Sequence, residues 1–379
     1  MGKRQNGEGT IYQRSNGLWV AEITLGYDDN GKRIRKTLSS MNLDKLKKRL
    51  NDMRYMNDRN IVAAPTEYTV ASWLDFWLET YKKPSVKSTT YDMYYNAVNT
   101  YLKKYLGNYK LDNVTTIIVQ NMINEVSKCG VRSKKELSYS SLRILYLTLS
   151  QAYKQAVRLG IVYFNPCKDI VLPKKKARPV VAFTVDEQFK CTKFCMDDNN
   201  TYKNLFVFAF NTGMRMGELL ALTWRDYDEN KKSVIINKNL SVVHDYSDSG
   251  KKQKIIIDST KTQDGMREIP LSNQAIEIIE RQKKKSKNKS LFVFCSEVGT
   301  PLQKRNIYRS LKNMLEKTEI TSPVTFHSFR HSFATRLLEK GADIKTVSTL
   351  LGHKSIQITL DIYSHVSTNL KEQTIALLN

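Results

Sequence analysis

The chain has 379 residues, of which 41% are hydrophobic and 10% aromatic. At roughly 150 residues per domain, this length predicts two or three packed domains, and the composition excludes a disordered or low-complexity chain. Lysine and arginine number 61 against 37 acidic residues, a formal charge of +24, which indicates a polyanionic partner. We find no apolar run of membrane length, no signal peptide and no lipidation signal in the sequence. It therefore favours nucleic acid over a membrane surface as the partner, and it predicts a cytoplasmic protein.

The first predicted domain, residues 1–64, alternates strand-like runs with turns. Its runs at 9–14, 18–25 and 32–38 are separated by Asn-Gly sequences, which are strong hairpin signals. Residues 44–57 then place apolar side chains at helical spacing. The pattern predicts a three-stranded sheet with one packed helix. The third strand is basic, and we favour DNA contact over simple solvation of an edge strand for Lys32, Arg33, Arg35 and Lys36.

The second predicted domain, residues 68–172, follows a linker at 63–67 and reads as an all-helical bundle. Apolar periodicity predicts helices over 69–81, 88–107, 115–128 and 138–159. Their aromatic stripes are typical of core. Basic clusters that either grip phosphates or form solvated faces lie at 82–83, 87, 103–104 and 132–135.

The third predicted domain, residues 180–379, follows a stiff basic linker at 173–179 that suits a strap across DNA. Thr184 and Glu187 match a helix capping box. The rest reads as helices, apart from a strand group at about 233–271. The fold class expected is therefore multidomain: a small α+β domain, an all-α bundle, and a mainly α domain with a small antiparallel sheet.

Three blocks of the third domain point to a specific chemistry. They are 211–222 (NTGMRMGELLAL), 325–335 (TFHSFRHSFAT) and 350–365 (LLGHKSIQITLDIYSH). In residue type, order and spacing they resemble the signatures of the tyrosine recombinases, the phage integrase family, and the resemblance covers about residue 184 to the C-terminus. The two upstream domains resemble the arm-binding and core-binding domains of integrases from conjugative transposons.

The resemblance implies a site-specific DNA recombinase, the integrase or excision enzyme of a mobile genetic element. Such an enzyme cuts and rejoins double-stranded DNA through a 3′-phosphotyrosyl intermediate and a Holliday junction. A homotetramer on core and arm DNA sites is implied, with an excisionase or a DNA-bending protein as a possible helper. Neither a metal nor another cofactor is expected.

Cutting a phosphodiester directly requires a nucleophile, stabilisation of charge on the non-bridging oxygens, and a proton for the leaving oxygen. Arg215 and Arg330 match the family arginines, and guanidinium groups bind phosphate through a fork of donors. Tyr363 matches the nucleophile. His327, one helical turn before Arg330, is expected to assist in accepting the tyrosine proton, and His353 to donate a hydrogen bond to the phosphate.

The proton for the leaving 5′ oxygen is assigned to a lysine. Residues 255–271 read as two strands around an Asp-Gly turn, which places Lys261 near a hairpin tip. This matches the family's β-hairpin lysine, a mobile general acid. Lys254 and Arg267 are nearby competitors for the role.

Other polar residues receive supporting or structural interpretations. Glu218 follows Arg215 by one turn and is expected to orient that arginine or to cap neighbouring amides. His331 and His365 are expected to support the site. Cys191 and Cys195 have the spacing of two metal ligands on a helix, but no second pair follows, so buried thiols are expected.

Two alternative functions share part of this pattern. A type IB topoisomerase has the same arginine and tyrosine chemistry but does not imply a separate amino-terminal domain. A regulator without catalytic activity would bind DNA yet have no reason to combine all six candidate catalytic residues.

The C-terminal tail at 364–379 has an apolar set that so short a segment cannot bury alone. Its partner is either the tail's own domain or a neighbouring protomer. The family resemblance favours the neighbouring protomer.

Overall fold

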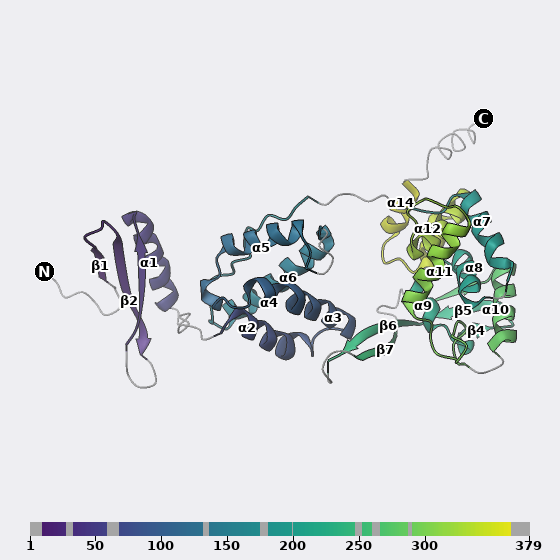
Figure 1. Ribbon diagram of the computed structural model, residues 1–379, viewed down its shortest axis with the longest axis horizontal. Helices are drawn as coiled ribbons and strands as arrows, with labels where there is room; N and C mark the ends of the chain where they lie inside the picture. Colours follow the sequence, from purple (N-terminus) through teal and green to yellow (C-terminus); the bar gives the residue numbers. More distant parts are fainter. Residues whose placement is uncertain are drawn as a thin grey trace, which may run out of the picture. The chain divides into compact units, whose positions relative to one another are not determined.

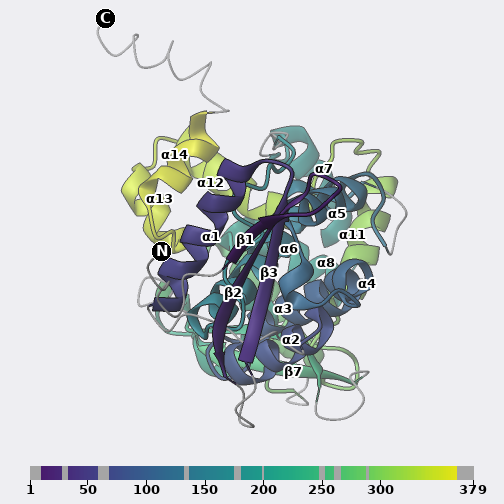
Figure 2. The ribbon, with the colours of Figure 1, turned by 90° about the vertical axis from the view of Figure 1, so that its left-hand side faces the viewer.

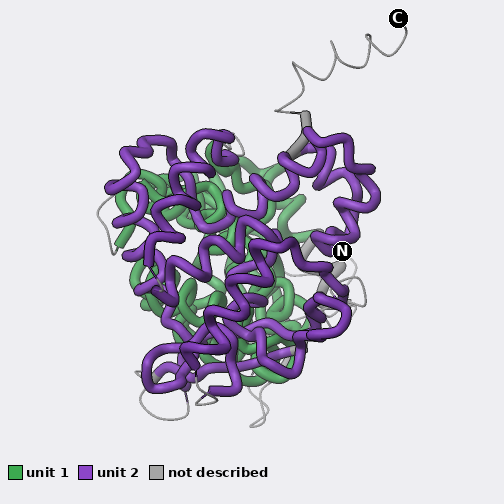
Figure 3. The backbone as a smooth tube through the Cα atoms, turned by 90° about the vertical axis from the view of Figure 1, so that its right-hand side faces the viewer, with its two compact units in different colours: residues 1–176 green, residues 177–379 purple. Residues whose placement is uncertain are grey.

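The computed structural model describes residues 10–27, 33–58, 68–131, 136–174, 181–198, 200–246, 252–259, 266–286 and 290–364. At 25–27, 33–34, 52–58, 252, 259 and 362–364 it describes the backbone alone. The chain forms two compact units, residues 1–176 and 177–379 (Figure 3).

The first unit begins with an antiparallel sheet in the order β1-β2-β3, followed by α1 (Figure 2). These elements are β1 (Thr10–Gln13), β2 (Trp19–Tyr27), β3 (Arg33–Ser40) and α1 (Leu43–Asp58). Gly17 takes a φ of 79° between β1 and β2, as the predicted Asn-Gly turn requires. Ile23 and Leu38 of the sheet pack with Leu46 and Leu50 of the helix. A three-stranded sheet with one packed helix is therefore observed, as expected.

Helices make up the rest of the first unit (Figure 1). They are α2 (Val70–Trp77), α3 (Ser88–Ala97), α4 (Lys103–Leu106), α5 (Thr116–Lys128) and α6 (Tyr139–Arg158). A π-helical turn at Leu78–Lys82 extends α2, and another at Val98–Leu102 joins α3 to α4. The described residues therefore form four continuous helical segments, as expected. Trp73, Trp77 and Tyr91 are core, as expected, and the buried Trp73 indole donates to the Ala152 carbonyl at 3.1 Å. Phe76 and Tyr109 are instead exposed.

Some basic residues of the bundle make contacts within it. Lys82 donates to Gln151 at 2.7 Å and lies over the Trp77 ring at 5.0 Å. Lys103 pairs with Asp75 at 2.5 Å. These contacts join helices of the bundle, so the two lysines have a structural role in it. Residues 132–135 lie outside the described residues.

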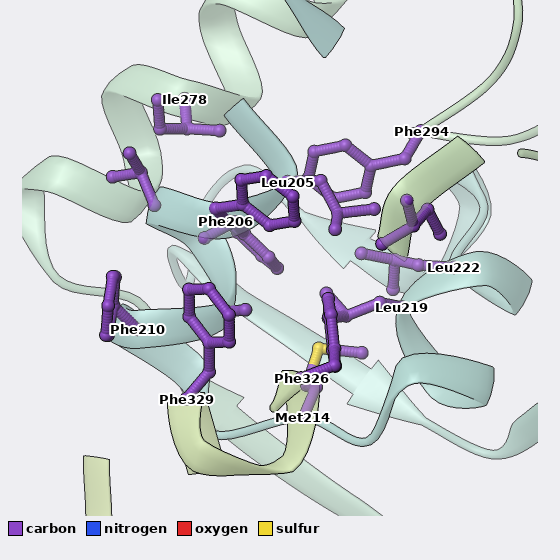
Figure 4. Close-up of a cluster of buried hydrophobic side chains, with 14 of the residues drawn as sticks. Leu205, Phe206, Phe210, Met214, Leu219, Leu222, Ile278, Phe294, Phe326 and Phe329 are labelled. Atoms are coloured by element: carbon purple, nitrogen blue, oxygen red, sulfur yellow. The ribbon is translucent and has the colours of Figure 1, made fainter. Parts of the chain in front are cut away.

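The second unit is built around α8, which is buried on nearly every side and is therefore its central helix. Figure 4 shows Phe206 and Phe210 of α8 facing Phe329 in the core; the ring centroids of Phe210 and Phe329 are 4.4 Å apart. The predicted capping box at Thr184 is present. The helices are α7 (Val185–Met196), α8 (Thr201–Thr212), α9 (Met216–Ala221), α10 (Asn273–Ser286), α11 (Lys304–Lys317), α12 (Phe326–Glu339), α13 (Ile344–Leu351) and α14 (Ile356–Ser364).

The strands of this unit form two small antiparallel sheets. One has the order β4-β5-β8, with β4 (Tyr227–Asp228), β5 (Ser233–Ile236) and β8 (Arg267–Pro270). The other pairs β6 (Lys238–Asp245) with β7 (Lys252–Ser259), which extend away from the helices (Figure 1).

The predicted pairing of two strands around the Asp-Gly sequence at 264–265 is wrong. β7 pairs with β6, and β8 pairs with β5. Burial explains the choice, because Ile269 of β8 lies opposite Val234 of β5 and both are buried in the main core. The local turn signal does not outweigh this long-range burial.

All five cysteines are free. Cys191 and Cys195 are buried thiols, as expected, and burial raises their pKa values to about 11 and about 12. Cys167 is also buried, whereas Cys129 is exposed and Cys295 is half-buried. Within the described ranges, no helix is both long and apolar enough to cross a membrane.

Candidate active site

The first block forms a tight turn between two helices. α8 ends at Gly213, whose φ of +61° is the left-handed conformation that glycine favours. A Cβ there would meet Phe333 at 2.5 Å and Leu351 at 2.9 Å. Met214 is buried in the core (Figure 4), and Arg215 caps the start of α9. The turn therefore anchors Arg215 to the core through its neighbours.

Arg330 of α12 is 2% exposed and donates from Nη1 to the Gly213 carbonyl at 2.9 Å and from Nη2 to the Leu351 carbonyl at 2.6 Å. Burial and the charge of Arg215 lower its pKa to about 9, so it remains charged at neutral pH. His327 lies one turn earlier on α12, as its spacing predicted. Partial burial and the charges of Arg330 and Arg215 lower the pKa of His327, which favours a neutral ring.

Three successive carbonyls at the C-terminal end of α13 accept hydrogen bonds from three different arginines. Arg267 Nε donates to Leu350 at 2.6 Å, Arg330 to Leu351, and Arg215 Nη2 to Gly352 at 3.1 Å. The last carbonyls of a helix lack intrahelical partners and carry partial negative charge, so guanidinium donors suit them. This turn, residues 350–352, brings β8, α12 and the start of α9 together.

Glu218 connects two of these arginines. It is 4% exposed; Oε1 accepts from Arg215 Nη1 at 2.8 Å and from Arg267 Nη1 at 3.2 Å. Oε2 accepts from the Arg215 backbone N–H and from Arg267 Nη2, each at 2.8 Å. Burial alone would raise the pKa of Glu218, but hydrogen bonds and charge from Arg267, with smaller effects from Arg215, hold it below the ordinary value. The contacts agree with an orienting role toward Arg215.

His353 follows the turn directly. Its backbone N–H donates to the Ser348 carbonyl at 3.1 Å, and its Nδ1 lies 2.8 Å from the hydroxyl of the buried Thr359. Burial, then the charges of Arg330 and Arg215, lowers the pKa of His353 to about 3. His331 packs perpendicular to His327 with ring centroids 4.6 Å apart, and burial lowers its pKa to about 4. The His353 and His331 rings are therefore neutral at pH 7.

The structure gathers Arg215, Arg330, His327 and His353, and places the backbone of Tyr363 in α14, which packs with α12 and α13. The Tyr363 side chain lies outside the described residues, as do Lys261, His365 and the tail at 365–379.

The competitors of Lys261 differ sharply in their surroundings. Lys254 is exposed on β7, opposite Val243. Arg267 is 7% exposed and bonded to Glu218 and Leu350, which does not suit a mobile proton donor.

Sequence reasoning missed two contacts of this site. The sequence suggests Arg267 only as a competing proton donor. It lies two residues before the buried Ile269 on the same face of a strand, and that period of two is a signal for burial. No sequence pattern indicates the contact of Thr359 with His353, because the connection between two helices separates these residues.

Two regions of the chain match models of phage integrase domains. Residues 182–369 match the phage integrase family, and residues 69–127 match the N-terminal SAM-like domain of phage integrases. A XerC-like tyrosine recombinase of Caldanaerobacter subterraneus subsp. tengcongensis is 29% identical over 381 residues, which cover 94% of each chain. The ICEBs1 integrase of Bacillus subtilis is 25% identical, and the match covers 96% of this chain and 97% of the relative.

Solved structures share the fold. The Tn1549 transposon integrase fragment in complex with circular intermediate DNA has a TM-score of 0.66 at 21% identity, covering 82% of this chain and 99% of that one. A lambda integrase dimer bound to a core site has a TM-score of 0.61 at 20% identity, covering 95% and 96%. The expected fold class is confirmed. With its two domain matches and its full-length relatives, the chain belongs to the phage integrase family, the tyrosine recombinases, which cut and rejoin DNA strands.

Proposed function

We propose that this tyrosine recombinase is the integrase of a mobile genetic element and acts on double-stranded DNA in the cytoplasm. It exchanges strands at specific sites through a 3′-phosphotyrosyl intermediate and a Holliday junction. The convergence of Arg215, Arg330 and His353 on the turn at 350–352, beside the helix that contains Tyr363, supports this most directly.

Arg215 and Arg330 bind the scissile phosphate. A guanidinium has five N–H donors, and within the described structure each of these two arginines uses its Nη1 and Nη2 groups for one protein contact apiece. The other N–H groups serve the non-bridging oxygens. Because protein contacts hold both groups before DNA arrives, little reorganisation is needed when charge develops in the transition state.

The remaining residues supply the nucleophile, transfer protons and bind the phosphate. The Tyr363 oxygen attacks phosphorus as its proton passes to neutral His327, and the bond from phosphorus to the 5′ oxygen breaks. Lys261 gives that oxygen a proton, and His353 donates a hydrogen bond to the phosphate. One phosphodiester replaces another, so a later 5′ hydroxyl reverses the step without a nucleotide or metal cofactor.

The domains divide the DNA between them. Residues 1–64 bind arm sites, while 68–172 and 180–379 clasp core sites, and the charge of +24 suits this extended contact. One lambda integrase structure is a tetramer bound to a Holliday junction, and we extend that homotetramer to this chain. An excisionase or a DNA-bending protein is its expected helper.

A covalent-adduct experiment tests the nucleophile. On a suicide DNA substrate, the wild-type chain should form a denaturation-resistant adduct, and Tyr363→Phe should bind DNA without forming one because it lacks the attacking oxygen. Tyr308→Phe is the control, since Tyr308 is 51% exposed on another helix, α11. An adduct formed by the purified Tyr363→Phe protein would reject the assignment, and mapping its residue would identify the true nucleophile.

A further inference from the structure

Arg267 is a buried cation for which the strand-exchange chemistry provides no direct task. It lies on β8 with 7% of its surface exposed, facing the same side as the buried Ile269. A buried guanidinium is costly unless its donors are paired. Its pairing is specific: Nε bonds the Leu350 carbonyl, and both Nη groups bond the two oxygens of Glu218.

We propose that Arg267 is a positioning residue, which holds Arg215 and His353 in their working places through Glu218 and the turn at 350–352. The proposal rests on the phosphate-binding roles proposed above for those two residues. Arg267 itself does not touch the reacting atoms.

The first connection runs through Glu218. Arg267 engages both carboxylate oxygens, and the same two oxygens accept from the Arg215 side chain and backbone. With Arg267 present, rotation of the carboxylate would break contacts on two sides. Without it, Arg215 alone would orient Glu218, and the bond to the Gly352 carbonyl would be the remaining fixed support described for the Arg215 guanidinium.

The second connection runs through the backbone. Leu350 precedes the two residues whose carbonyls hold Arg330 and Arg215, and His353 follows them. A bond to Leu350 therefore fixes one end of the segment on which three proposed site residues depend. A lysine has one nitrogen, so it cannot reproduce the fork that spans Leu350 and both oxygens of Glu218.

The charges around Glu218 supply a signature that loss of fold would not produce. Arg215 and Arg267 contact the carboxylate directly, and Arg330 of α12 lies close enough for electrostatic interaction. Asp226 and Lys238, which pair with each other at 2.7 Å, line a small recess with it. Removing Arg267 leaves burial opposed mainly by Arg215, so the pKa of Glu218 should rise. Protonated Glu218 has lost its charge and part of its acceptor capacity, so it should hold Arg215 less firmly and cleavage should weaken toward low pH.

The experiment measures single-turnover cleavage of the suicide substrate and DNA affinity from pH 5.5 to 8.5 for full-length variants. Arg267→Gln should keep DNA affinity within about threefold and slow cleavage about 10- to 100-fold, the range typical of groups that orient reacting residues. Its rate should fall further at low pH, and adding Glu218→Gln should remove that fall. Arg267→Lys should lie between Arg267→Gln and wild type. Arg281→Gln, which removes a surface ion pair with Glu277, is the matched control and should cleave normally.

Two results would overturn the proposal. One is cleavage by Arg267→Gln at the wild-type rate. The other is slower cleavage with an unchanged pH profile, which would show that Arg267 has a structural role only. If Arg267→Gln does not fold, the pH profile of Arg267→Lys decides in the same way. Adduct formation by the wild-type chain tests the proposed function separately, since the positioning role concerns only the ratio of variant to wild type.

Discussion

Thr359 fixes one side of the His353 ring from a fully buried position. When its hydroxyl donates to Nδ1, the ring proton resides on Nε2, which is the tautomer that a phosphate donor at Nε2 requires. Thr359→Val should therefore slow cleavage about tenfold, as expected for an outer group that orients a functional side chain. Thr359→Ser keeps the hydroxyl and should cleave nearly normally. Equal single-turnover rates for the Val and Ser variants would remove Thr359 from the site.

Sequence spacing predicts the neighbours of a residue within one helical turn. Glu218 contacts Arg215, and His327 lies one turn before Arg330, as expected. The bond from Arg267 to Leu350 joins residues 83 positions apart. Only the tertiary fold brings such atoms together, so no local pattern could reveal it.

Among the elements, the turn that joins α8 to α9 is the most constrained part of the site. Gly213→Ala should lower the free energy of unfolding by about 1–3 kcal/mol from the left-handed backbone alone, with an added cost from the clash with Phe333 and Leu351. It should also slow cleavage, because the Gly213 carbonyl holds Arg330.

Gly341→Ala is the matched control for that turn, since Gly341 has a φ of +82° but open space around its Cβ position. Urea unfolding should show a smaller loss there, with normal cleavage. Equal losses of stability in the two variants would mean that the close approach at Gly213 has no energetic role.

The elements also show what periodicity can predict. The helices were predictable because apolar residues recur along each of them at the helical period. The partner of β7 was not, because the choice between β6 and β8 depends on which faces are buried once the whole unit is assembled.

For the whole molecule, the proposed division of labour predicts separable DNA binding. The sheet and α1 have their own apolar cluster, so residues 1–64 should protect an arm sequence in footprinting, while 68–379 should protect a different core sequence and still cleave it. Both affinities should fall with rising salt, because lysine and arginine release counterions from DNA. Footprints that coincide for the two fragments would contradict the division.

The turn at 350–352 has a further consequence for the molecule as a whole. Three guanidinium groups meet there, and Glu218 supplies a single negative charge among them. The free protein therefore folds with repulsion among these guanidinium groups, which the phosphate proposed to bind there would relieve. A ligand that binds only the folded chain stabilises it, so DNA bound at these arginines should raise the free energy of unfolding of the second unit.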